Sequence, residues 1–273
     1  MSKTMKIGNR KFELGKKTYI MGILNVTPDS FSDGGKFNNI DAAVAHALEM
    51  IEEDVDIIDI GGESTRPGHI AVSEEEELER IVPIIKEIRK HTDIPISIDT
   101  YKGKVAEEAI KAGASLINDV WGFKKDPYMS KVAAKYDVPC CLMHNRENQN
   151  YNNLIEDMIE DLKECVSIAL SSGVKKENII LDPGVGFAKT YEDNLNVMRN
   201  LDRFKELGYS MLLGTSRKSL IGNTLNLPPK ERVEGTIATT VIGVMNGYDF
   251  VRVHDVKENS RAALMADAIY RKK

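Results

Sequence analysis

The chain has 273 residues, of which 42% are hydrophobic and 29% are charged, and its formal net charge is −5 at pH 7. This length and apolar content exclude a disulfide-stabilised miniprotein and a disordered chain, and the acidic balance lacks the basic stripe that nucleic-acid binding requires. Three cysteines, two of them adjacent, indicate a reducing compartment, and no stretch approaches the ~20 apolar residues of a membrane span, so we expect a cytoplasmic protein without nucleic-acid or membrane partners.

The first predicted element is a hairpin over residues 5–14, where polar and apolar residues alternate around Gly8-Asn9. From there one unit repeats: a short β-branched apolar run, a turn, and an amphipathic helical pattern. The runs are nearly continuous in hydrophobicity, which is typical of strands in a buried parallel sheet. These predicted strands cover residues 19–24, 56–60, 95–98, 115–118, 138–143, 178–181, 210–213 and 250–253.

A helical pattern follows every predicted strand. Ser73 with Glu76 three residues later is a capping-box signature at the start of the second helix, and Gly113 is placed to end the third. The apolar stripes lie within residues 44–51, 78–88, 106–110, 128–136, 155–166, 195–204, 233–244 and 262–269.

Eight strands alternating with eight helices predict a (β/α)8 TIM barrel, with the hairpin closing its bottom. An open doubly wound sheet alternates in the same way and stays an alternative. Eight units within about 250 residues favour the barrel. Because no linker or shift in composition interrupts the chain, we expect one domain over residues 1–273.

Polar side chains stand where the predicted strands end, which is where a barrel carries its chemistry. Three of them, Asp99, Asn118 and Asp182, are short acids and amides that suit the donor–acceptor edge of a polar heterocycle. A carboxylate can accept two parallel N–H bonds from such an edge. Any one of the three could instead orient a neighbouring side chain.

A second subset consists of potential cations in an acidic protein: Arg66, Lys218, Arg252 and His254. They favour an anionic substrate such as a phosphate or diphosphate, with solvated surface side chains as the alternative. The run Cys140-Cys141-Leu-Met-His144 resembles part of a zinc site. Successive strand residues point to opposite faces and no second ligand pair follows, so we interpret these residues as core and loop residues.

Two long segments, MGILNVTPDSFSDGG at 21–35 and DIGGESTRPG at 59–68, strongly resemble the signatures of the dihydropteroate synthase family. Shorter segments agree in the same order, so the resemblance spans almost the whole chain. One departure is Ala188 after Phe187, where the family often has glycine. The shorter matching segments lie at 98–100, 118–120, 142–145, 182–184, 214–218 and 252–254.

The resemblance implies a TIM-barrel transferase of folate biosynthesis that joins para-aminobenzoate to 6-hydroxymethyl-7,8-dihydropterin diphosphate, releasing 7,8-dihydropteroate and pyrophosphate. It implies Mg²⁺ on the diphosphate with Asn25 as a ligand, and catalytic roles for Asp99, Lys218, Arg252 and His254. The implied pterin contacts are Asp99, Asn118, Met143, Asp182, Lys218 and Arg252; the diphosphate contacts are Arg66, Arg252 and His254; the aminobenzoate contacts are Thr65, Pro67, Phe187, Ser216 and Lys218.

The expected mechanism is leaving-group-first substitution, because an arylamine is a weak nucleophile and the pterin can delocalise positive charge. A pterin-dependent methyltransferase shares the barrel and pocket but does not need the diphosphate cations. A catalytically silent pterin-binding protein would be expected to lose Asn25, Arg66 or Lys218, and all three are present.

Two expectations concern assembly and binding order. Residues 231–246 are rich in small and β-branched side chains on more than one face, and the family commonly pairs through its last helices, so we expect a homodimer. Loops 25–39 and 61–72 have few apolar anchors and should be mobile without ligand, so the aminobenzoate pocket should be completed only when diphosphate is bound. Their five glycines are Gly34, Gly35, Gly61, Gly62 and Gly68.

Overall fold

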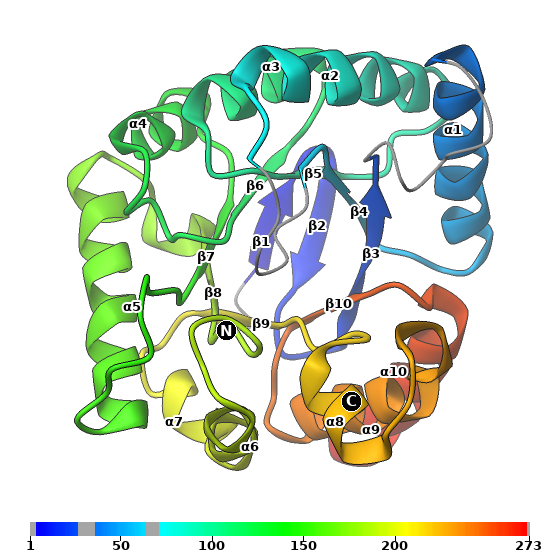
Figure 1. Cartoon of the computed structure of the whole chain (residues 1–273). Coiled ribbons are helices and arrows are strands. Elements are labelled where there is room, and N and C mark those ends of the chain that lie inside the picture. Colours follow the sequence, from blue (N-terminus) through cyan, green and yellow to red (C-terminus); the bar gives the residue numbers. More distant parts are fainter. Residues whose placement is uncertain (1–3, 27–35, 64–70, 272–273) are drawn as a thin grey trace.

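The computed structural model describes residues 4–26, 36–63 and 71–271, with backbone alone for 36–39, and its centre is a closed barrel of eight parallel strands (Figure 1). The last strand pairs with both the first and the second-last, which closes the sheet and excludes the open doubly wound alternative. The barrel strands are β3 (Tyr19–Asn25), β4 (Ile57–Gly61), β5 (Ile96–Asp99), β6 (Leu116–Asp119), β7 (Cys140–Met143), β8 (Ile179–Asp182), β9 (Ser210–Leu213) and β10 (Phe250–Val253).

The strands are apolar on both faces because each strand separates two cores. Cys140 packs in the outer core between strands and helices, whereas Cys141, its neighbour in β7, packs in the inner core of the barrel. Ile57 and Ile58 of β4 divide in the same way. This period of two within continuous hydrophobicity is the pattern expected for a strand that is buried on both sides.

The predicted hairpin is present as β1 (Thr4–Ile7) and β2 (Arg10–Glu13), and its turn includes Gly8 at φ 57°. Its apolar residues pack against residues at the amino-terminal ends of the barrel strands, and the ring centroids of Phe12 and Tyr19 are 4.7 Å apart. The hairpin therefore closes the bottom of the barrel, as predicted, and leaves the carboxyl-terminal end for a site.

The helices form a ring around the barrel (Figure 1). They are α1 (Lys36–Glu52), α2 (Glu74–His91), α3 (Gly103–Ala112), α4 (Pro127–Tyr136), α5 (Leu154–Ser171), α6 (Tyr191–Arg199), α7 (Leu201–Lys205), α8 (Ser219–Leu225), α9 (Val233–Met245) and α10 (Val256–Tyr270), with short 3₁₀ turns η2 (Lys176–Asn178) and η3 (Pro229–Glu231). Among the described residues, none of these helices is long and apolar enough to cross a membrane.

Strict alternation of one helix per strand is wrong at two places. The helix predicted across 195–204 is divided at Asn200, whose side-chain amide donates to the Asn196 carbonyl at 2.8 Å. Asparagine competes in this way with the helical hydrogen bonds, so the chain turns there. The second difference is α8, which precedes α9 in the same connection and has no clear apolar stripe.

The predicted helix boundaries at Ser73 and Gly113 are confirmed. The Ser73 hydroxyl accepts a hydrogen bond from the Glu76 backbone N–H at 3.1 Å, and Gly113 ends α3 at φ 123°. Half of the expected capping box is absent, because the Glu76 carboxylate pairs with Arg80 instead of returning to Ser73. Serine at an N-cap needs only its own hydroxyl to satisfy a free N–H.

Candidate active site

The carboxyl-terminal end of the barrel gathers the predicted site residues that the structure describes. Asp99 and Asn118 are register partners on β5 and β6, and Met143 and Asp182 are partners on β7 and β8. The others lie at the end of β3 (Asn25), within β10 (Arg252), or in the segments after β8, β9 and β10 (Phe187, Ser216, Lys218 and His254).

Arg252 joins the two carboxylates at the centre of the site. Its Nη2 donates to Asp99 Oδ2 at 2.6 Å and its Nε donates to Asp59 Oδ2 at 2.6 Å. Asn118 Nδ2 donates to the same Asp59 oxygen at 3.1 Å. Asp59 thus orients both a predicted cation and a predicted amide, although its own side chain is fully buried.

No role was predicted for Asp59 from the sequence. The available signal was a charged side chain between Ile58 and Ile60 within an apolar strand. A buried carboxylate in such a strand needs partners, and here the partners come from β6 and β10, which are distant in sequence.

Burial raises the pKa of Asp99 to about 7, with the charge of Asp59 adding to this shift and Arg252 opposing it. Its Oδ1 atom is buried and has no hydrogen-bond partner within the described part of the chain. A buried acceptor without a donor is energetically unfavourable, so this oxygen is suited to receive an N–H group from a ligand.

The raised pKa of Asp99 predicts a pH-dependent stability. A carboxyl whose pKa is raised above 3.8 in the folded protein stabilises the fold at pH values below 3.8. This contribution is lost as the pH rises through the folded-state pKa of about 7. Asp99→Asn removes this titration. The melting temperature of the variant, relative to that of the wild type, should therefore be higher at pH 8 than at pH 5, by about 2–4 °C for each kcal/mol. Thermal unfolding at both pH values tests this; an equal difference at both would contradict it.

Asp182 and Lys218 form the second half of the site. Burial raises the pKa of Asp182, opposed by the charge of Lys218, and burial lowers the pKa of Lys218 to about 8. Lys218 Nζ donates to the Val185 carbonyl at 2.5 Å and lies 4.6 Å from the ring centroid of Phe187. The Lys218 ammonium thus lies over the ring of Phe187, a predicted aminobenzoate contact, and its charge offsets that of Asp182, a predicted pterin contact.

Ser216 and His254 are linked by two hydrogen bonds. The His254 backbone N–H donates to Ser216 Oγ at 3.1 Å, and this hydroxyl lies 3.0 Å from His254 Nδ1. Between Ser216 and Lys218, Arg217 has φ 58° and its guanidinium pairs with Asp255. This ion pair holds the left-handed backbone in place and so fixes the residues on either side.

Three predicted substrate contacts, Thr65, Arg66 and Pro67, lie outside the described residues. Asn25 ends β3 opposite Gly61, and its half-buried side chain has no hydrogen bond to another described residue. Across residues 4–26, 36–63 and 71–271 there is no group of three His, Cys, Asp or Glu side chains that could hold a metal ion.

A closed barrel whose carboxyl-terminal end gathers acids, an amide and cations in one cluster defines a TIM-barrel protein with a polar ligand site at that end. The sequence model of the family described as "Pterin binding enzyme" matches residues 21–254, which cover all the predicted site residues.

Comparison with curated relatives identifies the family within this class of protein. The chain is 70% identical to the dihydropteroate synthase of Clostridium beijerinckii, covering 98% of this chain and 100% of that relative. It is 60% identical to the Bacillus subtilis dihydropteroate synthase, over 94% and 90% of the two chains. The protein belongs to the dihydropteroate synthase family and is a transferase.

Solved structures agree with this assignment. A dihydropteroate synthase from Clostridium difficile, solved in the presence of pteroic acid, superposes with a TM-score of 0.94 at 59% identity, over 96% of this chain and 100% of that one. A Xanthomonas albilineans dihydropteroate synthase with 4-aminobenzoic acid gives a TM-score of 0.94 at 38% identity, over 100% of both chains. The closed barrel is therefore the fold of known enzymes of this family.

Proposed function

We propose that the protein condenses 6-hydroxymethyl-7,8-dihydropterin diphosphate with para-aminobenzoate, giving 7,8-dihydropteroate and pyrophosphate in cytoplasmic folate biosynthesis. The observation that carries the proposal is the buried Asp99 Oδ1, which has no hydrogen-bond partner among the described residues. It lies beside Arg252 and Asn118 and would serve as an acceptor for a heterocycle. Relatives solved with pteroic acid and with 4-aminobenzoic acid support the two halves of the product.

The pterin would lie at the centre of the barrel mouth. Asp99, Asn118 and Asp182 would bind its polar edge, with Met143 lining the pocket and Arg252 stacking on the ring. Arg252 is held at two points by Asp59 and Asp99, so its guanidinium plane is preorganised for this contact. Because the acids are buried, each hydrogen bond to the ligand forms in a low dielectric and is strengthened.

The carbon–oxygen bond to diphosphate would break first, because the charges that form on both fragments can be stabilised. The methylene carbon loses its oxygen bond to diphosphate, the pterin delocalises the resulting cation, and the amine nitrogen of aminobenzoate then bonds to that carbon and releases a proton to solvent. Arg66, Arg252 and His254 would stabilise the negative charge on the leaving group. Asp99 would stabilise the cationic ring, which favours its ionised form.

The residues fit a Mg²⁺ ion that is held largely by the substrate. Asn25 offers one half-buried neutral oxygen at the barrel mouth, and Mg²⁺ commonly combines few protein ligands with phosphate oxygens and water. When bound there, the ion would supply additional charge neutralisation to the leaving diphosphate. Titration of Mg²⁺ with and without the pterin diphosphate tests this, and tight binding to the free protein would contradict it.

A steady-state assay of pyrophosphate release tests the proposal. Pyrophosphate release should require both aminobenzoate and the pterin diphosphate, with one dihydropteroate formed for each pyrophosphate. Pyrophosphate release that does not depend on aminobenzoate would overturn the proposal. Pterin binding without turnover would favour the catalytically silent protein, and methyl transfer would favour the methyltransferase, although family membership favours the synthase over both.

The order of binding is a separate prediction. Thr65, Arg66 and Pro67 are expected around the second substrate and lie outside the described residues, whereas Phe187, Ser216 and Lys218 form the described side of that pocket. Aminobenzoate should bind at least about tenfold more tightly with pterin and Mg²⁺-pyrophosphate present, because anionic contacts offset the ordering of loop residues at about 1 kcal/mol each. Calorimetry with and without pterin and pyrophosphate tests this; equal affinities would show a preformed pocket.

Assembly into a homodimer is proposed from the outer surface of α9 and α10, which pack side by side (Figure 1). Leu264 and Met265 are 71% and 63% exposed, and Met245 and Ile269 are also exposed. Exposed apolar side chains on these two helices favour contact with a second copy. Light scattering should give twice the monomer mass at micromolar concentration, and Leu264→Glu should give the monomer mass; a monomeric wild type would defeat the proposal.

A further inference from the structure

A buried lysine lies behind the loop that carries Phe187. Lys189 is only 6% exposed, and its Nζ is surrounded by three acceptors: His144 Nδ1 at 3.0 Å, the Gly184 carbonyl at 3.0 Å and the Phe187 carbonyl at 2.9 Å. Burial lowers the pKa of Lys189 to about 7. In its ammonium form the side chain has three N–H donors, one for each of these acceptors. Lys189 thus ties the two ends of the Gly184–Phe187 turn to the end of β7.

His144 connects this lysine to α5. Its side chain is fully buried, and its Nε2 lies 2.9 Å from Asp161 Oδ2. Burial lowers the pKa of His144 to about 4, with the charge of Lys189 adding to the shift. The imidazole is therefore neutral at pH 7, donates from Nε2 to Asp161 and accepts from Lys189 at Nδ1.

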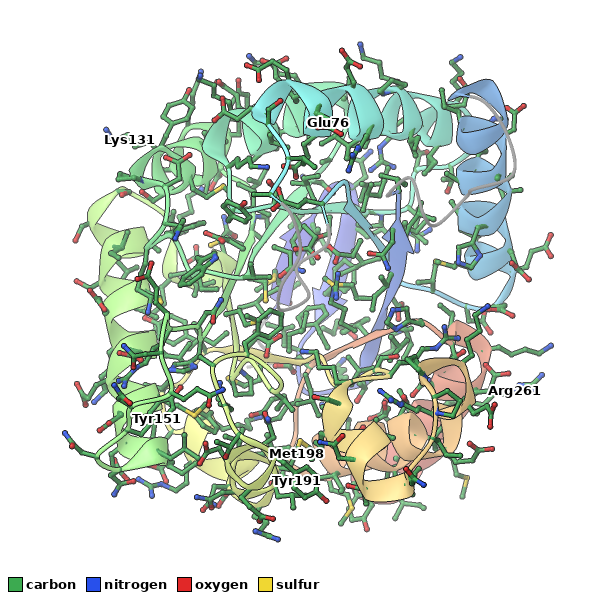
Figure 2. All side chains as sticks on the ribbon, viewed as in Figure 1. Glu76, Lys131, Tyr151, Tyr191, Met198 and Arg261 are labelled. Carbon is green, nitrogen blue, oxygen red and sulfur yellow. The ribbon has the colours of Figure 1, made fainter. Side chains whose placement is uncertain are left out.

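A second chain of contacts runs from the same aspartate to the same loop. Arg146 Nε donates to Asp161 Oδ2 at 2.5 Å, and the guanidinium carbon lies 4.6 Å from the ring centroid of Tyr151. The Tyr151 hydroxyl donates to the Ala188 carbonyl at 2.9 Å, and Figure 2 shows Tyr151 at one end of α5. Asp161 thus supports three carbonyls of the loop through two routes.

The loop combines an internal hydrogen bond, from the Phe187 N–H to the Gly184 carbonyl at 3.1 Å, with left-handed backbone. Gly184, Gly186 and Ala188 all have positive φ, at 67°, 90° and 47°. A side chain on Gly184 would collide with the His144 carbonyl, so the turn is pressed against the end of β7. Ala188 adopts a conformation that costs a residue with a Cβ about 1 kcal/mol or more.

We infer that Lys189 is a positioning residue for the aminobenzoate side of the site: it holds the Gly184 and Phe187 carbonyls and thereby the Phe187 ring against Lys218. The inference rests on the proposed function, which places aminobenzoate beside Phe187. Because Asp182 is bound to the Gly184 N–H at 2.7 Å, the pterin side is also affected, but through one further contact. Loss of Lys189 should therefore weaken aminobenzoate binding more than pterin binding.

The test compares three variants with the wild-type enzyme. Lys189→Met keeps the length of the side chain and removes all three N–H donors. Tyr151→Phe removes only the donor to Ala188 and preserves the ring, so it should fold even if the first variant does not. Met158→Ala truncates a fully buried residue of α5 outside the network and serves as the control for lost stability.

Lys189→Met should raise the KM for aminobenzoate by about tenfold or more with a smaller change in the KM for the pterin diphosphate, and Tyr151→Phe should raise it by about threefold. Met158→Ala should lower the melting temperature with both KM values unchanged. An active wild type with unchanged aminobenzoate KM in Lys189→Met, or in Tyr151→Phe if the former does not fold, overturns the inference. Absence of the condensation in the wild type itself would instead overturn the proposed function.

Discussion

Asp99→Ala is expected to cause a large loss of pterin binding while the barrel stays folded. The variant loses the buried acceptor Oδ1 and the ion pair with Arg252, but Arg252 keeps Asp59 as a partner at 2.6 Å, so no buried cation is left alone. A charged hydrogen-bond partner lost in a buried site costs about 2–3 kcal/mol, or roughly a factor of 30–150 in affinity. Turnover should fall by about 10²–10³, because the same carboxylate faces the developing cation.

Calorimetric titration with a pterin ligand and circular dichroism measure the two effects separately. Asp249→Ala is the matched control, because Asp249 is equally buried but lies at the amino-terminal end of the barrel, where its Oδ1 accepts from the Gly15 N–H at 2.9 Å. The control should lose stability and keep pterin affinity. Unchanged affinity in Asp99→Ala would refute the assignment of Asp99 to the pterin.

Lys218→Met is expected to impair both substrates at once. Its ammonium offsets the charge of Asp182, donates to the Val185 carbonyl and lies over the Phe187 ring. Removing the ammonium takes away the largest of the positive charges that offset the buried Asp182 carboxylate, although Arg252 still contributes. The pKa of Asp182, already raised by burial, should rise further, so this acid becomes a poorer acceptor for the pterin edge. We expect kcat/KM for either substrate to fall by about 10²–10³.

The control for this lysine is Lys205→Met. Lys205 also donates to a backbone carbonyl, that of Gly247, at 2.5 Å, but it does so beside the start of β10 at the opposite end of the barrel. Its loss should leave both KM values at the wild-type level. A Lys218→Met enzyme within about threefold of wild-type kcat/KM would show that Phe187 and Asp182 keep their positions without the ammonium.

Much of the fold could be predicted from local sequence patterns. Near-continuous apolar runs predicted all eight barrel strands to within a residue or two, since a strand buried on both faces is mostly apolar. The hairpin at Gly8 and the helix ends at Ser73 and Gly113 depend on local backbone chemistry and were therefore also predictable. The polar residue at the end of β5, Asp99, followed from the rule that barrel sites lie at strand ends.

Only the tertiary structure decided how those polar residues are paired. Asp59 lies between Arg252 and Asn118, which follow it by 193 and 59 residues, so no local pattern could assign its role. The split of one helix at Asn200 also depends on a side chain that competes for a backbone carbonyl, which periodicity does not detect.

The clearest case is Lys189. In the sequence it is one lysine among many charged residues before a helix, and lysines are rarely buried. In the fold it is enclosed by His144 from β7's end and by its own loop, and it becomes the donor to three acceptors. The sequence by itself determined the barrel and the end at which its site lies, because hydrophobic periodicity is local. Which buried charges neutralise one another was decided only by the closed barrel, because burial and pairing depend on strands that meet across it.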